Sequence, residues 1–347
     1  MTTLDLPYVT DRYKEIALQC GLSSKDILSI ERYAQKLEAN GLPVIFDEKH
    51  FSALVGYDIS LLYAISNDQR KFYRSFNIPK RNGKLRQIDE PLPTLKEIQR
   101  YILDNILSNV EISKASKAFS RHSDIKKNAR IHIRQPEILK VDIKDFFPSV
   151  NISSVYKALY ALGYTDSLAM LFAQICCLDK SLPQGAPTSP ALANIVCRDL
   201  DHDLLKYCTD RNLRYTRYAD DITISGERIK KETITEVRFM IKSFKFKLNE
   251  EKTSIMRSGS RKVVTGIIVN TRMQAPRETR REFRKNVFFI RKFGVDGHIS
   301  QIEEDRNNYL RHIIGVGEFI LWVDNKNKEV VSDLNFLKRL LKSESVV

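Results

Sequence analysis

Three aspartates occupy positions at which an ionised carboxylate is unfavourable unless a cation or another partner stabilises it. Asp142 lies in the apolar run 138–143, which reads as a buried strand. Asp220 and Asp221 follow one another inside residues 215–225, which read as two β-prone arms around a tight turn. Like charges held close together favour a bound divalent cation, and two Mg²⁺ ions can promote transfer of a nucleotide. A simple acidic turn, and a buried ion pair for Asp142, are the alternatives.

A polar loop separates these acids along the chain. Gln184-Gly185 stands in the proline-rich stretch 183–190, just before a helix predicted to start near Ala191. Glycine is expected where a backbone must approach a ligand closely, and proline stiffens a loop. A proline-rich entry to a helix would explain the prolines, but it leaves the Gln-Gly pair unexplained.

Composition sets limits on function. The chain has 347 residues, 42% of them hydrophobic, so disorder is excluded and two or three lobes are expected. No apolar run is long enough to cross a membrane, the N-terminus does not resemble a secretion signal, and the five cysteines lack CxxC spacing. We therefore expect a cytoplasmic protein, with neither a zinc site nor disulfides. A net charge of +14 favours an anionic partner.

The positive charge is concentrated near the C-terminus. Residues 1–70 carry 7 basic and 10 acidic side chains, whereas residues 257–292 carry 11 and 2. Within the second segment, basic residues recur at three- and four-residue intervals, with apolar residues between them at helical spacing. This pattern predicts a helix with one cationic and one apolar face. The basic residues are Arg277, Arg280, Arg281, Arg284, Lys285, Arg291 and Lys292, and the apolar ones are Phe283, Val287 and Ile290.

The remaining patterns indicate an α+β protein, with strands in the middle of the chain and helices at both ends. Asn82-Gly83 predicts a hairpin tip, and the period of residues 171–178 does not decide between helix and strand. The other expected elements are helices in residues 1–70, at Thr94–Leu107 and across Glu278–Leu341, and a strand at Val263–Val269 interrupted by one glycine.

The order of these motifs resembles that of a reverse transcriptase. The strand with Asp142, the Gln184-Gly185 loop and the string Tyr218-Ala219-Asp220-Asp221 follow one another as in that family, and the resemblance extends from Phe72 to Val269. Two further strings are typical of bacterial retron reverse transcriptases: Asn128-Ala129-Arg130-Ile131-His132 and Val264-Thr265-Gly266. The resemblance implies a right-hand polymerase, with an N-terminal helical region at 1–70, fingers and palm at 71–260, and a thumb at 261–347.

The resemblance also implies roles for the acids and for an aromatic residue. Asp142 and Asp220 would ligate two Mg²⁺ ions, Asp221 would support them, and the backbone carbonyl of Ile143 would complete one coordination shell. Phe147 would lie beneath the incoming sugar and exclude a 2′-OH, although one of Phe146 and Phe147 is expected to be an ordinary core residue.

Other residues would position the dNTP substrate. Gln184 and Gly185 would contact template and nucleotide. Lys80 and Arg86, on either side of the Asn82-Gly83 turn, would hold the triphosphate, although solvated cations are also normal at a hairpin tip. Lys252 matches a proposed proton donor to pyrophosphate, against the alternative of an ordinary surface lysine.

The implied partner is structured RNA. The basic helix would bind RNA phosphates, or would simply be a solvated face, and Asn128 and His132 would support either the fold or an RNA contact. Retron enzymes copy part of their own noncoding RNA into branched, RNA-linked single-stranded DNA (msDNA), and they commonly act with an effector protein in anti-phage defence. An intron-type maturase and a non-catalytic RNA-binding scaffold are the alternatives.

Overall fold

The computed structural model describes residues 11–79, 83–120, 123–302 and 308–344. The chain forms two compact units. Unit 1 comprises residues 1–119, 143–204 and 238–248, and unit 2 comprises residues 120–142, 205–237 and 249–347. This grouping by contacts is not a division into fingers, palm and thumb, so the three predicted domains stay a prediction.

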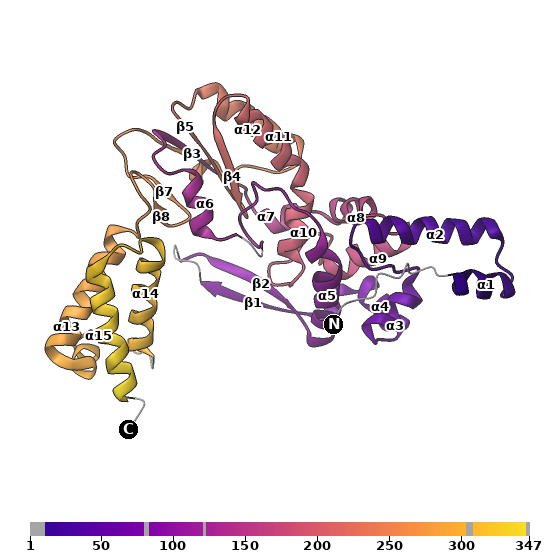
Figure 1. Ribbon diagram of the computed structural model, residues 1–347, viewed down its shortest axis with the longest axis horizontal. Coiled ribbons are helices and arrows are strands. Elements are labelled where there is room, and N and C mark those ends of the chain that lie inside the picture. The colour runs from indigo at the N-terminus through magenta and orange to yellow at the C-terminus, as the bar shows by residue number, and fades with distance from the viewer. Residues whose placement is uncertain (1–10, 80–82, 121–122, 303–307, 345–347) are drawn as a thin grey trace. The chain divides into compact units, whose positions relative to one another are not determined.

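Four helices begin unit 1 (Figure 1). They are α1 (Asp11–Gln19), α2 (Ser24–Ala39), α3 (Glu48–Val55) and α4 (Ile59–Asn67), as the helical reading of this region predicted. Their starts are encoded locally, because the side chains of Ser23, Asp47 and Asp58 accept hydrogen bonds from backbone N–H groups of the first turns. Helices α2, α3 and α4 bury apolar side chains, among them Leu37, Phe51 and Leu62, whereas Ile16 and Leu18 of α1 are exposed.

An antiparallel hairpin follows, made of β1 (Tyr73–Pro79) and β2 (Leu85–Pro91). Pro79 pairs with Leu85, so the expected hairpin is confirmed, while residues 80–82 of its tip lie outside the described residues. The helix expected at 94–107 is shorter. It is α5 (Pro93–Tyr101), and it continues as a wider π-helical turn, Ile102–Ile106, and a 3₁₀ turn, Leu107–Asn109. The wider turn keeps both Ile102 and Ile106 fully buried.

Helices make up most of the remainder of unit 1. Residues 171–178, which the sequence left undecided, lie mainly in α9, and all of them except Gln174 are buried. The elements are α7 (Phe146–Ser149), α8 (Ile152–Ala161), α9 (Asp166–Cys176) and α10 (Ser189–Val196). Two further helices, α11 (Arg198–Thr209) and α12 (Lys231–Ser243), pass from one unit into the other.

A four-stranded antiparallel sheet forms the centre of unit 2. Its order is β4 (Arg214–Tyr218), β5 (Asp221–Gly226), β3 (Glu137–Asp142) and β6 (Ser254–Met256). The strands expected around the three aspartates are therefore confirmed. Helix α6 (Ile125–Ile131) precedes β3, and a short 3₁₀ turn, η4 (Glu250–Lys252), precedes β6.

The single strand expected at 263–269 is wrong. The segment folds back on itself as β7 (Val263–Val264) and β8 (Ile267–Ile268), with Val264 paired to Ile267. Both turn residues have positive φ, 45° at Thr265 and 81° at Gly266. Two consecutive positive φ values match the twist of a tight hairpin, so the glycine completes a turn and does not merely interrupt a strand.

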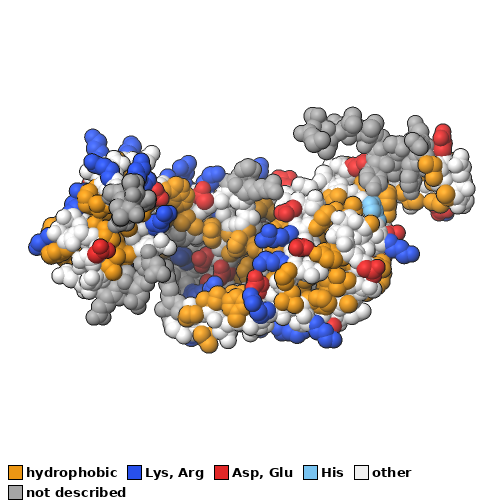
Figure 2. Space-filling model, turned by 90° about the horizontal axis from the view of Figure 1, so that it is seen from below, with side chains coloured by type: hydrophobic (Ala, Val, Ile, Leu, Met, Phe, Trp, Pro, Cys, Tyr) orange, Lys and Arg blue, Asp and Glu red, His pale blue; other side chains and the backbone are white. Residues whose placement is uncertain are grey.

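Three helices close unit 2: α13 (Arg277–Ile302), α14 (Tyr309–Val323) and α15 (Lys328–Glu344). Phe283, Val287 and Ile290 of α13 are buried in their shared core, as the spacing predicted. The helix bends at Gly294, where φ is 74°. Figure 2 shows Lys and Arg side chains gathered over this helical end, at the left of the view. In the described part of the chain, no helix has the length and apolarity needed to span a membrane.

Candidate active site

The pairing of three strands brings the predicted acids together. Asp142, the last residue of β3, lies directly opposite Asp221, the first residue of β5, so their side chains point to the same face of the sheet. Asp221 also pairs with Tyr218 of β4, which leaves Ala219 and Asp220 as a two-residue turn between the strands. Asp142 thus lies beside Asp221 at one end of the sheet although the two are remote in sequence, while their role as metal ligands stays a prediction.

The turn that carries Asp220 has an unusual backbone. Ala219 has φ of 56°, a conformation that costs energy for any residue with a Cβ. Its carbonyl oxygen accepts a hydrogen bond of 3.2 Å from the guanidinium of Arg217, a side chain fully buried from solvent. The sequence offered no reason to single out Arg217, because an arginine on a strand next to a turn is ordinarily read as exposed.

Burial and the repulsion between neighbouring carboxylates both disfavour the ionised forms of Asp220 and Asp221. Burial raises the pKa of Asp220, and the charges of Asp221 and then Asp142 raise it further. Burial and the charge of Asp142 also raise the pKa of Asp221, while Lys140 opposes that change. Their ionised forms are thus disfavoured in the protein by itself, and a nearby cation would relieve this cost.

Lys252 supplies a cation to this cluster. Its ammonium lies 2.9 Å from Oδ2 of Asp142, and this hydrogen bond raises the pKa of Lys252. Only 8% of the Asp142 side chain is exposed, whereas the lysine side chain is 62% exposed. The backbone places both partners, because the Asn249 N–H, just before the turn with Lys252, donates to the Asp142 carbonyl over 2.8 Å.

The donor atoms of the site suit a hard divalent ion. Carboxylate and carbonyl oxygens are the ligands that Mg²⁺ prefers, and Asp142, Asp220 and Asp221 are close enough to influence one another's ionisation. Within the described ranges, however, no group of three or more His, Cys, Asp or Glu is already arranged around a common metal position.

The backbone at Ile143 is paired with a neighbouring segment of the chain. Ile143 and Leu248 form an isolated antiparallel bridge. The flanking hydrogen bonds are made by the residues on either side, from Lys144 N–H to the Lys247 carbonyl and from Asn249 N–H to the Asp142 carbonyl. The role of Ile143 as a metal ligand stays a prediction that this bridge geometry permits.

Unit 1 brings together two of the residues predicted to bind the nucleotide. Arg86 of β2 and Gln184 line one cavity of about 300 Å³, together with Arg70. Gly185 lies against the same hairpin, where its φ is 138° and an added Cβ would come within 2.5 Å of the Asp89 carbonyl oxygen. The Asp89 N–H donates to the Gln184 carbonyl over 2.8 Å. The close approach that requires this glycine is thus made by a protein backbone. Lys80 lies outside the described residues.

The two adjacent phenylalanines differ in burial. Phe146 is 4% exposed and contacts Phe246, whereas Phe147 is partly exposed and lies near Phe119. Assigning one ring to the core and Phe147 to a ligand-accessible position agrees with this difference. Asp145, between the two phenylalanines and β3, is exposed and has φ of 47°.

His132 and Asn128 are fully buried, so direct contact with RNA is not what their surroundings favour. The two ring nitrogens of His132 lie 2.6 Å from the Ser225 hydroxyl and 2.8 Å from the Thr216 hydroxyl. Burial, with a smaller contribution from the charge of Arg214, lowers the pKa of His132 to about 3. The neutral ring therefore fastens α6 to β4 and β5, which is the fold-supporting alternative.

The predicted RNA-binding residues of α13 lie on its solvent side. Arg277, Arg281, Arg284 and Lys285 are exposed, and Arg280 is half-buried with its Nε donating to the Ala275 carbonyl. A cationic face opposite a buried apolar face is confirmed, while RNA binding by that face stays a prediction.

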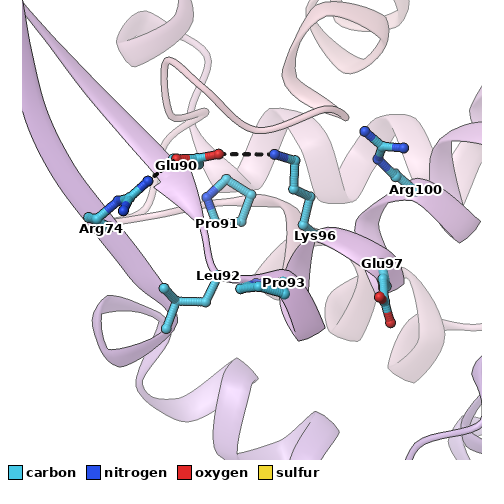
Figure 3. Close-up of a pocket in the computed structure, with 8 residues that line it drawn as sticks. All are labelled: Arg74, Glu90, Pro91, Leu92, Pro93, Lys96, Glu97 and Arg100. Carbon is cyan, nitrogen blue, oxygen red and sulfur yellow. Dashed lines mark hydrogen bonds and ion pairs between the residues drawn. The ribbon is translucent and has the colours of Figure 1, made fainter.

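One group of cations in unit 1 was not predicted from the sequence. A cavity of about 460 Å³ is bordered by Arg74, Lys96 and Arg100, with Glu90 between the first two, 2.8 Å and 3.0 Å from them (Figure 3). The residues come from β1, β2 and α5, and no sequence spacing links a strand cation to a helix cation. Only the pairing of the hairpin reveals the group.

Comparison with known proteins identifies the family. Residues 78–290 match the family model described as reverse transcriptase (RNA-dependent DNA polymerase). The Ec86 retron reverse transcriptase of Escherichia coli is 33% identical over 299 residues, which is 84% of this chain and 89% of that protein. The Mx65 retron reverse transcriptase of Myxococcus xanthus is 34% identical over 72% of this chain and 64% of that protein.

A solved structure is also similar. The telomerase of Candida albicans, in complex with a fragment of telomeric RNA, matches with a TM-score of 0.47 and 13% identity, over 79% of this chain and 59% of that one. The family match and the antiparallel sheet with its helices confirm the expected α+β right-hand polymerase fold. The chain belongs to the reverse transcriptase family, within it to the bacterial retron reverse transcriptases, and it is an RNA-directed DNA polymerase.

Proposed function

We propose that this polymerase copies part of a cognate noncoding RNA into branched msDNA, by nucleotidyl transfer at a site that holds two Mg²⁺ ions. The observation that supports the catalytic part is the placing of Asp142, Asp220 and Asp221 at the same end of the two inner strands, with burial and repulsion raising the pKa of the last two. The similarity to retron reverse transcriptases over most of the chain supports the retron part.

The residues of unit 2 would hold the reacting groups. Asp142 and Asp220 would bind the metal ions, which lower the pKa of the attacking hydroxyl and neutralise the leaving pyrophosphate. Asp221, opposite Asp142, would add negative charge that favours cation binding. Lys252 is long, exposed and within reach of this cluster, so once it releases Asp142 it could give a proton to the departing pyrophosphate.

The residues of unit 1 would bind and select the nucleotide. The cavity lined by Arg86 and Gln184 is polar, and Arg70 and Arg86 would supply the positive charge that a triphosphate requires, beside the carboxylates of Asp89, Asp145 and Asp179. The Gly185 contact holds the Gln184 loop against β2, which fixes the wall of this cavity. Phe147 presents a partly exposed ring that would exclude a 2′-OH and so favour dNTPs.

RNA recognition would rest on the exposed cations of α13, through contacts to phosphates. An effector protein and a role in anti-phage defence are part of the proposal by similarity to the retron family alone. No observation on the described residues favours a maturase or a non-catalytic scaffold over this function.

Primer extension tests the catalytic assignment. Asp220→Asn should abolish dNTP incorporation on an RNA template with Mg²⁺ while RNA binding is retained, because the change removes a metal-binding charge without altering size. Glu227→Gln, which neutralises an exposed acid just beyond β5, is the matched control and should keep full activity. Extension by Asp220→Asn at the wild-type rate would show that the acids are wrongly assigned.

Sequencing the nucleic acid that co-purifies with the wild-type protein tests the retron assignment. The expected species is a single-stranded DNA that stays joined to RNA after protein removal, and that separates when 2′,5′ bonds are cleaved. Recovery of linear DNA with no RNA attached would contradict branched synthesis and leave the polymerase assignment intact.

A further inference from the structure

The Lys252–Asp142 ion pair joins an exposed cation to a buried acid. Asp142 is held by its backbone on both sides, through the β3–β5 ladder and the hydrogen bond from Asn249. Lys252 sits at the end of a three-residue 3₁₀ turn, and most of its side chain is in solvent. The acid is therefore fixed, whereas the largely solvated lysine side chain can move away once another cation takes its place beside the buried acid.

The ammonium also meets the charge requirement of the acids. Its charge acts on Asp220 and Asp221 as well as on Asp142. Three carboxylates within range of one another are costly without a counterion, so a protein cation among them stabilises the sheet edge when no metal is bound. The same ammonium occupies an oxygen of Asp142 that a metal ion would need.

We propose that Lys252 is the resident counterion of the catalytic acids in the metal-free enzyme, and that a divalent ion must displace its ammonium from Asp142 in order to bind. This inference rests on the proposed two-metal site and adds a step before it. Metal binding becomes an exchange of cations at Asp142. The displaced lysine is released only in the metal-loaded enzyme, so its availability for pyrophosphate is coupled to occupation of the site.

The exchange predicts tighter metal binding when the lysine is neutralised. Lys252→Met keeps the length of the side chain and removes both the competitor for Asp142 and a positive charge near the ion. A unit charge about 6 Å from a divalent ion in a water-like medium changes the dissociation constant by about tenfold. Lys252→Met should therefore bind Mn²⁺ about tenfold more tightly than wild type does.

Mn²⁺ binding to the full-length protein, without nucleotide or RNA, measures this directly. Free Mn²⁺ is followed by electron paramagnetic resonance, so catalytic turnover is not needed. Lys140→Met is the matched control, because Lys140 acts on Asp221 through its charge but is not the ion-pair partner of Asp142. It should tighten binding by clearly less than Lys252→Met does.

A second readout is the shift in melting temperature that Mn²⁺ produces. Without metal, Lys252→Met should have a lower melting temperature than wild type, since the acids lose their counterion. Added Mn²⁺ should then raise its melting temperature by more than it raises that of wild type. The proposed exchange would be overturned if Lys252→Met bound Mn²⁺ with wild-type affinity. It would also be overturned if Lys140→Met increased the Mn²⁺ affinity as much as Lys252→Met does. In parallel, Asp220→Asn should lose Mn²⁺ binding. If it does not, the metal site of the proposed function is itself wrong, and the exchange is refuted with it.

Discussion

The buried His132 gives a prediction that can be worked out quantitatively. Its ring is fully buried between the hydroxyls of Ser225 and Thr216, and burial lowers its pKa from 6.5 to about 3. At mildly acidic pH, His132 is therefore protonated in the unfolded chain but stays neutral in the folded protein. The stabilising effect of the neutral ring is complete above pH 6.5 and is lost as the pH falls toward 3.

The magnitude follows from proton linkage. Each pH unit below 6.5 costs the folded state about 1.4 kcal/mol from this one group. Between about pH 7 and about pH 5 the loss is about 2 kcal/mol. His132→Gln removes the titration, so its free energy of unfolding should fall by about 2 kcal/mol less than that of wild type over the same interval. At neutral pH the variant should be less stable by about 1–3 kcal/mol, because a buried hydroxyl loses its partner.

Urea unfolding followed by far-ultraviolet circular dichroism measures both quantities. The fall in the free energy of unfolding between the two pH values is measured for wild type and for the variant. The difference between these two falls is the quantity of interest, because the contribution from titration of the acids cancels in it. His202→Gln, which replaces an exposed histidine on α11, is the control and should keep the wild-type loss. Equal pH dependence in wild type and His132→Gln would refute a neutral ring fastening α6 to the sheet.

Three further outcomes are expected. Gly185→Ala should lower the free energy of unfolding by about 2 kcal/mol or more in thermal melts, since its Cβ would meet the Asp89 carbonyl at 2.5 Å with φ of 138°, whereas Gly41→Ala, with open space around it, should lose less; equal losses would contradict this. Asp220→Asn should stabilise the metal-free protein by on the order of 1 kcal/mol at neutral pH. The folded-state pKa of Asp220 is raised, so its ionised form opposes folding, and the gain should shrink as the pH falls; a loss of stability would argue against this. Glu90→Gln should be slightly less stable than wild type at neutral pH, and this gap should close in acid, because its two cations lower the pKa of Glu90 and their benefit disappears on protonation; a gap that persists in acid would point to packing.

The elements around the three aspartates could be predicted because their signals are local. The apolar run ending at Asp142 and the β-prone arms around Asp220 each specify a strand by composition alone. Antiparallel pairing then places the acids together. The apolar spacing of α13 likewise specified which of its faces would be buried.

The missed features depend on contacts distant in sequence. Thr265 takes a positive φ that its residue type disfavours, and the hairpin at 263–268 forms because Val264 and Ile267 are buried against α6 and β3. The cations around Glu90 meet only after β1, β2 and α5 have packed. Arg217 resembles a surface residue in sequence, and only the folded strand shows it bonded to the turn carbonyl.

The opposed positions of Asp142 and Asp221 have a consequence for how this enzyme tolerates change. Their separation is set by main-chain hydrogen bonding between β3 and β5. This hydrogen bonding does not depend on which apolar side chains the neighbouring residues carry. Substitutions elsewhere in the strands can accumulate without moving the acids. A displacement of the pairing by one residue would instead turn Asp142 to the opposite face of the sheet. An inserted residue in either strand would therefore be far more damaging to this arrangement than most replacements.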